Sequence, residues 1–262
     1  MKSVRLGCVK YLNARPLIRG WSGDVEFDHP SALCRRLAQG HLDVALVSSF
    51  EFLRNPIYRI VDDVSIASDG PVYSVVVAHR GELSTVKEIE LDPASQTAAN
   101  LLRCLLTELG LNPRLIAGYS DTAASCPACL IIGDQAIRFR QTHSDAFQFW
   151  DLGEQWKNLT GLPFVYALWL IRPEVPDPEA IAERLRTIRD ENLADLTAIV
   201  SGAAADLSAD KQAITQQFLD RYYNEHLRFD FGTRAKQGLH TFADLCSKDG
   251  VLPKRVREFN LV

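Results

Sequence analysis

The stretch VRLGCVKYLN, residues 4–13, decides the class of fold, because it sets a buried strand against an abrupt polar stop. The apolar residues up to Leu12 predict a strand that neighbouring elements cover on both faces. Asn13 then stands where the N-cap of a helix over ARPLIRGW (14–21) is expected. An asparagine at this point is either a helix cap or a side chain at the mouth of a cleft.

Outward from this strand, short apolar runs alternate with segments of helical periodicity. The runs VEFDHP (25–30) and LDVALVSSF (42–50) predict strands, and SALCRRLAQG (31–40) predicts a helix capped by Ser31. This β-α-β-α-β order predicts an α/β fold with mostly parallel sheets flanked by helices.

The rest of the chain repeats this alternation of strands and helices and then becomes mainly helical. Further strands are expected at 73–79, 113–119, 128–134 and 147–153, a helix at 95–110, and long C-terminal helices at 177–201, 208–226 and 231–250. Two crossing segments, VYSVVVA (72–78) and FVYALWL (164–170), are interpreted as hinges. We therefore predict a discontinuous first lobe, residues 1–77 plus 166–262, with residues 78–165 inserted as a second lobe. A ligand is expected in the cleft between them.

Composition excludes several classes of function. The 262 residues are 47% hydrophobic and 24% charged, with a net charge of −4, so no basic face for nucleic acid is expected. No apolar run approaches the roughly 18 residues typical of a membrane span. The N-terminus lacks an apolar export signal, which predicts a cytoplasmic protein. No obligate protein partner is evident.

Motifs for metals, nucleotides and hydrolysis are missing from the sequence. It contains no Walker loop, G-x-G-x-x-G or G-x-S-x-G motif, and its six histidines lack ligand spacing, so no metal site is predicted. The six cysteines are interpreted as reduced, buried thiols. CPAC (126–129) is a lone C-x-x-C pair that lacks the second pair of a zinc site, and a structural role is favoured over a redox role.

Polar residues recur at the ends of predicted strands and the starts of predicted helices. They are Asn13, the pair Ser48 and Ser49, the segment SQT (95–97) and Asp134. Each alone is more often a cap or a turn than a site residue. Together, in a two-lobed chain, they indicate a pocket that holds a small anion through hydroxyls, amides and helix dipoles.

Several longer stretches resemble one family, the chorismate dehydratases of the futalosine route to menaquinone. The stretches are YLNARPL (11–17), GHLDVALVSSFEFL (40–53), SDGPVYSVVV (68–77), LIIGDQAI (130–137) and DLGEQWKNLTGLPFVYALW (151–169). The resemblance covers about residues 4–172, with a weaker match near the C-terminus. It implies a two-lobed fold similar to type II periplasmic binding proteins, and an enzyme that removes water from chorismate without a metal or organic cofactor.

The resemblance also implies roles for particular residues. Asn13 and Ser74 match the motif residues that we expect to be catalytic, by positioning the substrate or polarising the leaving hydroxyl. Weaker candidates for substrate binding are Ser49, Ser95, Thr97, Asp134 and Thr160, for which capping is an equally good explanation. No obvious general base lies in the matched motifs, so the enolpyruvyl carboxylate of the substrate itself is the expected base.

Three other readings remain open from the sequence. A solute-binding protein without catalysis fits the fold, although such proteins normally carry an export signal or lipoprotein cysteine. A naphthoate synthase of the same pathway fits as well, but its opening motif differs from YLNARPL. A ligand-sensing domain of a regulator is a third reading, without a visible helix-turn-helix segment.

Overall fold

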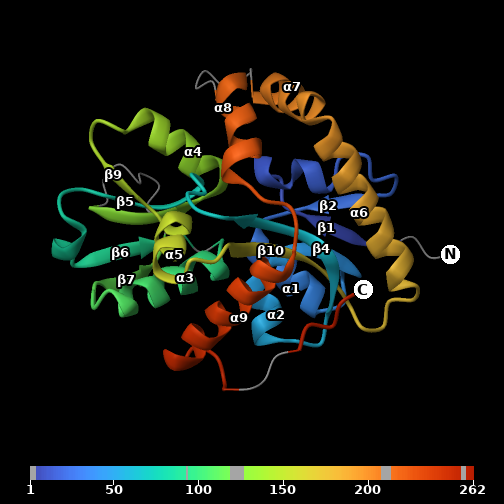
Figure 1. The fold of residues 1–262 in the computed structure, drawn as a ribbon, viewed down its shortest axis with the longest axis horizontal. Helices are drawn as coiled ribbons and strands as arrows, with labels where there is room; N and C mark the ends of the chain where they lie inside the picture. The colour runs from blue at the N-terminus through green and yellow to red at the C-terminus, as the bar shows by residue number, and fades with distance from the viewer. Residues whose placement is uncertain (1–3, 93, 119–126, 208–213, 255–257) are drawn as a thin grey trace.

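The computed structural model describes residues 4–92, 94–118, 127–207, 214–254 and 258–262. Within these residues the chain forms two five-stranded sheets with helices packed around both (Figure 1). In that view the sheet of β5 to β9 lies on the left, and the sheet that contains β1 and β4 lies on the right.

The first sheet has the strand order β2-β1-β3-β10-β4. Its strands are β1 (Leu6–Cys8), β2 (Val25–Phe27), β3 (Val44–Ser48), β4 (Arg59–Ser68) and β10 (Phe164–Ile171). β1 pairs in parallel with β2 and β3, whereas β10 runs antiparallel to β3 and β4. All five residues of β3 are buried, as its continuous apolar run predicts.

The second sheet has the order β7-β6-β8-β5-β9. Its strands come between β4 and β10 in the sequence. Its strands are β5 (Val75–His79), β6 (Glu88–Leu91), β7 (Arg114–Ala117), β8 (Ala128–Ile132) and β9 (Gln148–Asp151). β6 runs parallel to β7 and β8, and β5 runs antiparallel to β8 and β9.

Both sheets are therefore mixed, which corrects the expectation of mostly parallel sheets. The β-α-β units of the sequence do form parallel pairs. However, β5 follows β4 of the first sheet and β10 follows β9 and α5 of the second, so each strand arrives from the other sheet and no β-α-β crossover within one sheet constrains it to run parallel. The lobe boundaries at 77/78 and 165/166 stay a prediction.

The helices cover the sheets and join them. They are α1 (Pro30–Ala38), α2 (Ser49–Arg54), α3 (Gln96–Glu108), α4 (Gly133–Thr142), α5 (Leu152–Thr160), α6 (Pro178–Ala194), α7 (Leu196–Leu207), α8 (Gln216–Arg221) and α9 (Thr233–Lys248). Short 3₁₀ segments are η1 (Leu12–Leu17) and η2 (Leu83–Thr85), and η4 (Tyr222–His226) is a π-helical turn. Part of the helix predicted at 208–226 lies outside the described residues.

Two predicted caps are wrong and one is confirmed. Asn13 is not an N-cap but the second residue of η1, because Pro16 allows only a short 3₁₀ segment there. α1 begins at Pro30 after His29, since proline favours the first helical position, so Ser31 is not its cap. Ser95 does cap α3, accepting the N–H of Ala98 at 3.1 Å.

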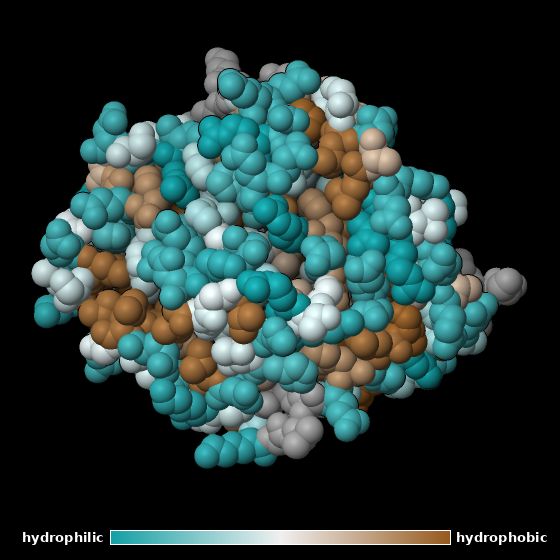
Figure 2. All heavy atoms as spheres, in the orientation of Figure 1, coloured by the Kyte–Doolittle hydropathy of each residue, from teal (hydrophilic) through white to brown (hydrophobic). Residues whose placement is uncertain are grey.

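Cysteines 8, 34, 104 and 246 are buried free thiols, as the sequence analysis expects, and Cys129 is buried as well. Cys129 lies in β8, and Cys126 of the CPAC segment lies outside the described residues. No helix in the described part of the chain is long and apolar enough to cross a membrane. Figure 2 shows one face that is largely hydrophilic, with hydrophobic patches separated by polar side chains.

A glycine in α9 sets how closely this helix approaches the loop before β10. A Cβ atom added to Gly238 would lie 2.1 Å from the backbone oxygen of Pro163, far inside van der Waals contact. We expect Gly238→Ala to lower the free energy of unfolding by about 2 kcal/mol, measured by urea denaturation. Gly202→Ala is the matched control, because Gly202 lies in α7 with no other atom within 4 Å of the added Cβ. That variant should be neutral or slightly stabilising, and equal losses in both would contradict the packing argument.

Candidate active site

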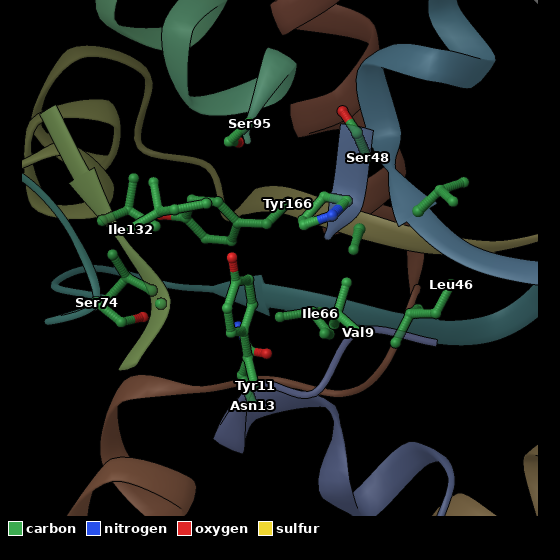
Figure 3. Close-up of a pocket in the computed structure, with 16 residues that line it drawn as sticks. Val9, Tyr11, Asn13, Leu46, Ser48, Ile66, Ser74, Ser95, Ile132 and Tyr166 are labelled. Carbon is green, nitrogen blue, oxygen red and sulfur yellow. The ribbon is translucent and has the colours of Figure 1, made fainter. Parts of the chain in front are cut away.

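A cavity with about 590 Å³ of empty space, including its open mouth, lies where the two sheets meet (Figure 3). Apolar side chains make up most of its wall, with a few polar groups among them, as in most small-molecule sites. The polar side chains that line it are Tyr11, Asn13, Ser48, Ser74, Ser95 and Tyr166. Strand residues of both sheets, such as Tyr166 of β10 and Val75 of β5, line the cavity, so a bound molecule would touch both halves of the protein.

Asn13 and Ser74, the two residues predicted to be catalytic, line this same cavity. The side-chain oxygen of Asn13 is buried and has no hydrogen-bond partner among the described residues. A buried acceptor without a partner costs free energy unless a ligand or water completes it. This oxygen is therefore available to accept a hydrogen bond from a molecule in the cavity.

The residue that precedes Ser74 in the chain has a strained backbone conformation. Tyr73, just before it, has a φ of +68°, a left-handed conformation that is unfavourable for a residue other than glycine. The carboxylate of Asp151 stabilises this conformation by accepting the N–H groups of Val72 at 3.0 Å and of Tyr73 at 2.7 Å. The same carboxylate caps α5, so one buried side chain fixes both the helix and the residue before Ser74.

Asp134 does not line the cavity, but it connects two segments that do. Its Oδ1 accepts the N–H of Leu12 at 3.0 Å, which joins the start of α4 to η1, next to Asn13. Gly133 beside it lies under the ring of Tyr11, where an added Cβ would be 3.2 Å from ring atoms. Burial raises the pKa of Asp134 to about 6, against the lowering effects of the Leu12 N–H and of Arg138.

The raised pKa of Asp134 predicts how stability depends on pH. Because the native state holds this proton more tightly than the unfolded state does, stability is greatest below the unfolded pKa of 3.8 and falls as pH rises toward about 6. Asp134→Asn keeps an oxygen for the Leu12 N–H and removes the buried charge. We expect the variant to gain on the order of 2 kcal/mol relative to wild type between about pH 4 and pH 7, measured by urea denaturation. A constant difference across that range would contradict the assignment.

Ser48, rather than Ser49, lines the cavity. Ser49 is buried instead, and its hydroxyl donates to the carbonyl of Val165 at 2.7 Å. Thr97 does not line the cavity either, but its hydroxyl is hydrogen-bonded to Ser48 and accepts the N–H of Phe50 at 3.3 Å. Thr97 thus supports Ser48 from α3. Ser95 lines the cavity while its hydroxyl caps α3.

Thr160 lies apart from the other candidates. It ends α5, where its hydroxyl donates to the carbonyl of Trp156 at 2.8 Å and accepts the N–H of Leu162 at 3.1 Å. These bonds finish the helix, so capping explains the residue without a ligand. Arg15 is also turned away, because its guanidinium pairs with Asp206 of α7 at 2.8 Å.

Two cavity residues were missed by sequence reasoning, Tyr11 and Tyr166. Figure 3 shows the Tyr11 ring extending into the middle of the cavity, with its hydroxyl on the side where Tyr166 lies. Burial raises the pKa of Tyr11 to about 12 and raises that of Tyr166 further, so both are neutral hydroxyl groups near pH 7. Both residues fall inside quoted motifs, but an aromatic residue in an apolar run reads as core packing.

In the described part of the chain, the wall of the cavity carries helix dipoles and no charged side chain. Among the described residues that line it, none is lysine, arginine, histidine, aspartate or glutamate. Ser95, the N-cap of α3, and Gly133, the first residue of α4, are both in the wall. The N-terminal ends of these two helices favour negative charge. No cluster of metal-ligating side chains occurs among the described residues.

Comparison with known proteins relates this site to a family. A family model described as menaquinone biosynthesis matches residues 4–248. The chain belongs to the menaquinone biosynthesis family. A member from Thermus thermophilus, named chorismate dehydratase, is 30% identical over 93% of this chain and 95% of its own length. A second protein of that name, from Campylobacter jejuni, is 30% identical over 60% of this chain and 58% of its own length. The resemblance drawn from the motifs is thereby confirmed.

Solved structures show that this menaquinone biosynthesis protein has a periplasmic-binding-protein-like fold, as predicted. A protein of Archaeoglobus fulgidus matches with a TM-score of 0.71 at 16% identity, over 95% of this chain and 98% of that one. The alkanesulfonate-binding protein of Xanthomonas axonopodis, bound to MOPS, matches with a TM-score of 0.69 at 16% identity, over 97% and 95%. At such identities the likeness concerns the fold alone.

Proposed function

We propose that this chain is a chorismate dehydratase, a hydro-lyase of the futalosine route to menaquinone that acts in the cytoplasm. It would convert chorismate to 3-[(1-carboxyvinyl)oxy]benzoate and water. Membership of the menaquinone biosynthesis family and the two relatives of that name support this proposal. The observation that carries it is the buried, unpartnered oxygen of Asn13 in the same cavity as Ser74. No nucleic acid, membrane or obligate protein partner belongs to the proposal.

The reaction requires little catalytic help from charged side chains. The ring proton that leaves lies on a carbon conjugated through the diene to the ring carboxylate, so its electron pair can spread over the ring and that carboxylate. The neighbouring hydroxyl then departs, takes up a proton and leaves as water. The ring becomes aromatic, which supplies much of the driving force. Catalysis therefore consists of holding the dianion in one pose and stabilising charge where it develops.

The cavity offers groups suited to that task. The Asn13 amide presents an acceptor oxygen and two donor hydrogens, enough to orient a substrate hydroxyl or carboxylate. The Ser74 hydroxyl belongs to a residue of the same cavity wall, and the N-terminal ends of α3 and α4 favour the two negative charges. The apolar wall excludes water, which strengthens each of these interactions.

The substrate itself is the base in this proposal. The wall described above offers no carboxylate, imidazole or amine, and Tyr11, whose pKa is about 12, is protonated at neutral pH. The enolpyruvyl carboxylate of chorismate lies next to the ring proton, because its ether oxygen is attached to the same carbon. It can take that proton and pass it to the departing hydroxyl, so that the atoms balance and no proton remains on the protein.

The test is a spectroscopic assay with chorismate. Purified protein is mixed with chorismate in buffer without added nucleotide, and the ultraviolet spectrum is followed as the diene becomes an aromatic ring. Proton NMR of the mixture identifies the product. We expect catalytic conversion to 3-[(1-carboxyvinyl)oxy]benzoate. No conversion at stoichiometric enzyme, together with tight binding of an unrelated solute, would overturn the proposal in favour of a binding protein.

A further inference from the structure

The C-terminal part of the chain contacts Ser74 and Leu12, the residue just before Asn13. Two consecutive tyrosines of the π-helical turn η4 make these contacts. The hydroxyl of Tyr222 donates to Ser74 Oγ at 2.7 Å, and the hydroxyl of Tyr223 donates to the carbonyl of Leu12 at 2.8 Å, next to Asn13. Short π-helical turns are frequently found at functional sites.

The bond from Tyr222 has a consequence for Ser74. A serine hydroxyl has one hydrogen to donate and two lone pairs that accept. Tyr222 occupies one of the lone pairs, and the Ser74 hydroxyl has no other hydrogen bond among the described residues. Its hydrogen is therefore free for an acceptor in the cavity that Ser74 lines. A hydroxyl that already accepts one hydrogen bond is also a stronger donor to the next acceptor.

The residues packed around Tyr222 hold its side chain in the position that bonds to Ser74. Its side chain is fully buried, with a relative exposure of 0%, and its ring stacks on Phe218 at 5.7 Å. Phe218 also contacts Tyr73, the strained residue just before Ser74, at 4.8 Å. Burial raises the pKa of Tyr222 well above its usual value, so its hydroxyl stays protonated and acts as the donor.

We propose that Tyr222 is a positioning residue, which fixes the Ser74 hydroxyl as a hydrogen-bond donor to an anionic oxygen of the substrate. The inference rests on the proposed function, because it assigns Tyr222 a part in the dehydration of chorismate. Tyr222 does not line the cavity and acts only through Ser74. The weaker sequence resemblance of this part of the chain gave no reason to single it out.

The experiment is a double-mutant cycle on chorismate turnover. Tyr222→Phe removes one oxygen and keeps the ring that stacks on Phe218. We expect kcat to fall by about 10-fold and KM to change by less than about 3-fold, because the interaction strengthens as charge develops. In a Ser74→Ala background the same change should alter kcat by less than about 2-fold, since the partner is already gone.

The control is Tyr58→Phe, which removes the hydroxyl of another fully buried tyrosine that does not line the cavity. Its kcat should equal that of wild type. If Tyr222→Phe lowers kcat by the same factor with and without Ser74, or leaves kcat unchanged, the positioning role is overturned.

The design separates this inference from the proposed function. Failure of the wild-type protein to convert chorismate is a failure of the function and says nothing about Tyr222. Crystal structures of wild type and Tyr222→Phe then decide the inference directly. A Ser74 side chain that turns to a new rotamer or partner in the variant supports it, and an unchanged Ser74 overturns it.

Discussion

Alanine at Asn13 or at Ser74 is expected to lower kcat for chorismate by at least about 100-fold, while the protein remains folded. Asn13 has an unpartnered side-chain oxygen in the cavity, and the Ser74 hydroxyl has a hydrogen left to donate there. Ser74→Ala also leaves the buried Tyr222 hydroxyl without its acceptor, which should lower the free energy of unfolding by about 1 to 3 kcal/mol but leave the protein folded. The measurement is the initial rate of diene loss over a range of chorismate concentrations, with thermal unfolding of each variant in parallel.

Ser65→Ala and Asn100→Ala are the matched controls for these two changes. Both residues are buried, and their side chains bond to backbone carbonyl groups of Asp230 and Gln96 outside the cavity. These variants should keep wild-type kcat and KM. If the changes at Asn13 and Ser74 also left turnover at the wild-type level, while Asp134→Ala abolished it, the assignment of roles would be wrong.

Asp151→Ala is expected to have the largest effect on stability, about 3 kcal/mol or more in the free energy of unfolding. Asp151 is 2% exposed and accepts four backbone N–H groups, those of Val72, Tyr73, Gly153 and Glu154. Without the carboxylate these N–H groups lose their acceptor. The hydrogen bonds that stabilise the left-handed conformation of Tyr73 are then gone. The folded fraction that remains should therefore also lose activity, because Ser74 moves with Tyr73.

Asp177→Ala serves as the comparison, because Asp177 is also a helix cap, at the start of α6, but lies at an exposed position. Among the described residues its carboxylate accepts only the N–H of Ala180, at 3.3 Å. This variant should lose about 1 kcal/mol at most and keep its activity. Urea denaturation and the chorismate assay measure both effects. Similar losses for the two variants would contradict the view that Asp151 positions Ser74.

The order of many strands and helices was predictable because it depends on local patterns, although β4 and α5 were not predicted. Buried strands such as β3 show as continuous apolar runs, and α3 shows a cap at Ser95 and helical periodicity. The direction of β5 and β10 was not predictable in this way. Whether a strand runs parallel to its neighbours depends on which sheet the chain has just left, and no local pattern records that.

The same difference between local patterns and contacts distant in sequence applies to the candidate site. Asn13 and Ser74 were found because their motifs resemble a family, whereas Thr160 was a cap whose hydroxyl looks the same in sequence as a ligand-binding hydroxyl. Ser48 lines the cavity and Ser49 does not, although the two are neighbours at the junction of β3 and α2, where the side-chain direction changes. The contact of Tyr222 with Ser74 spans 148 residues and has no local signature.

The central claim is that uncharged groups of one cavity hold chorismate while it loses water. The most direct test is a crystal structure of the protein with the product, 3-[(1-carboxyvinyl)oxy]benzoate. We predict that the aromatic ring lies in the cavity between the two sheets, with the Asn13 amide and the Ser74 hydroxyl within hydrogen-bond distance of its oxygen atoms. Product bound at another place, or in this cavity with an acidic or basic side chain at the reacting carbon, would contradict the account.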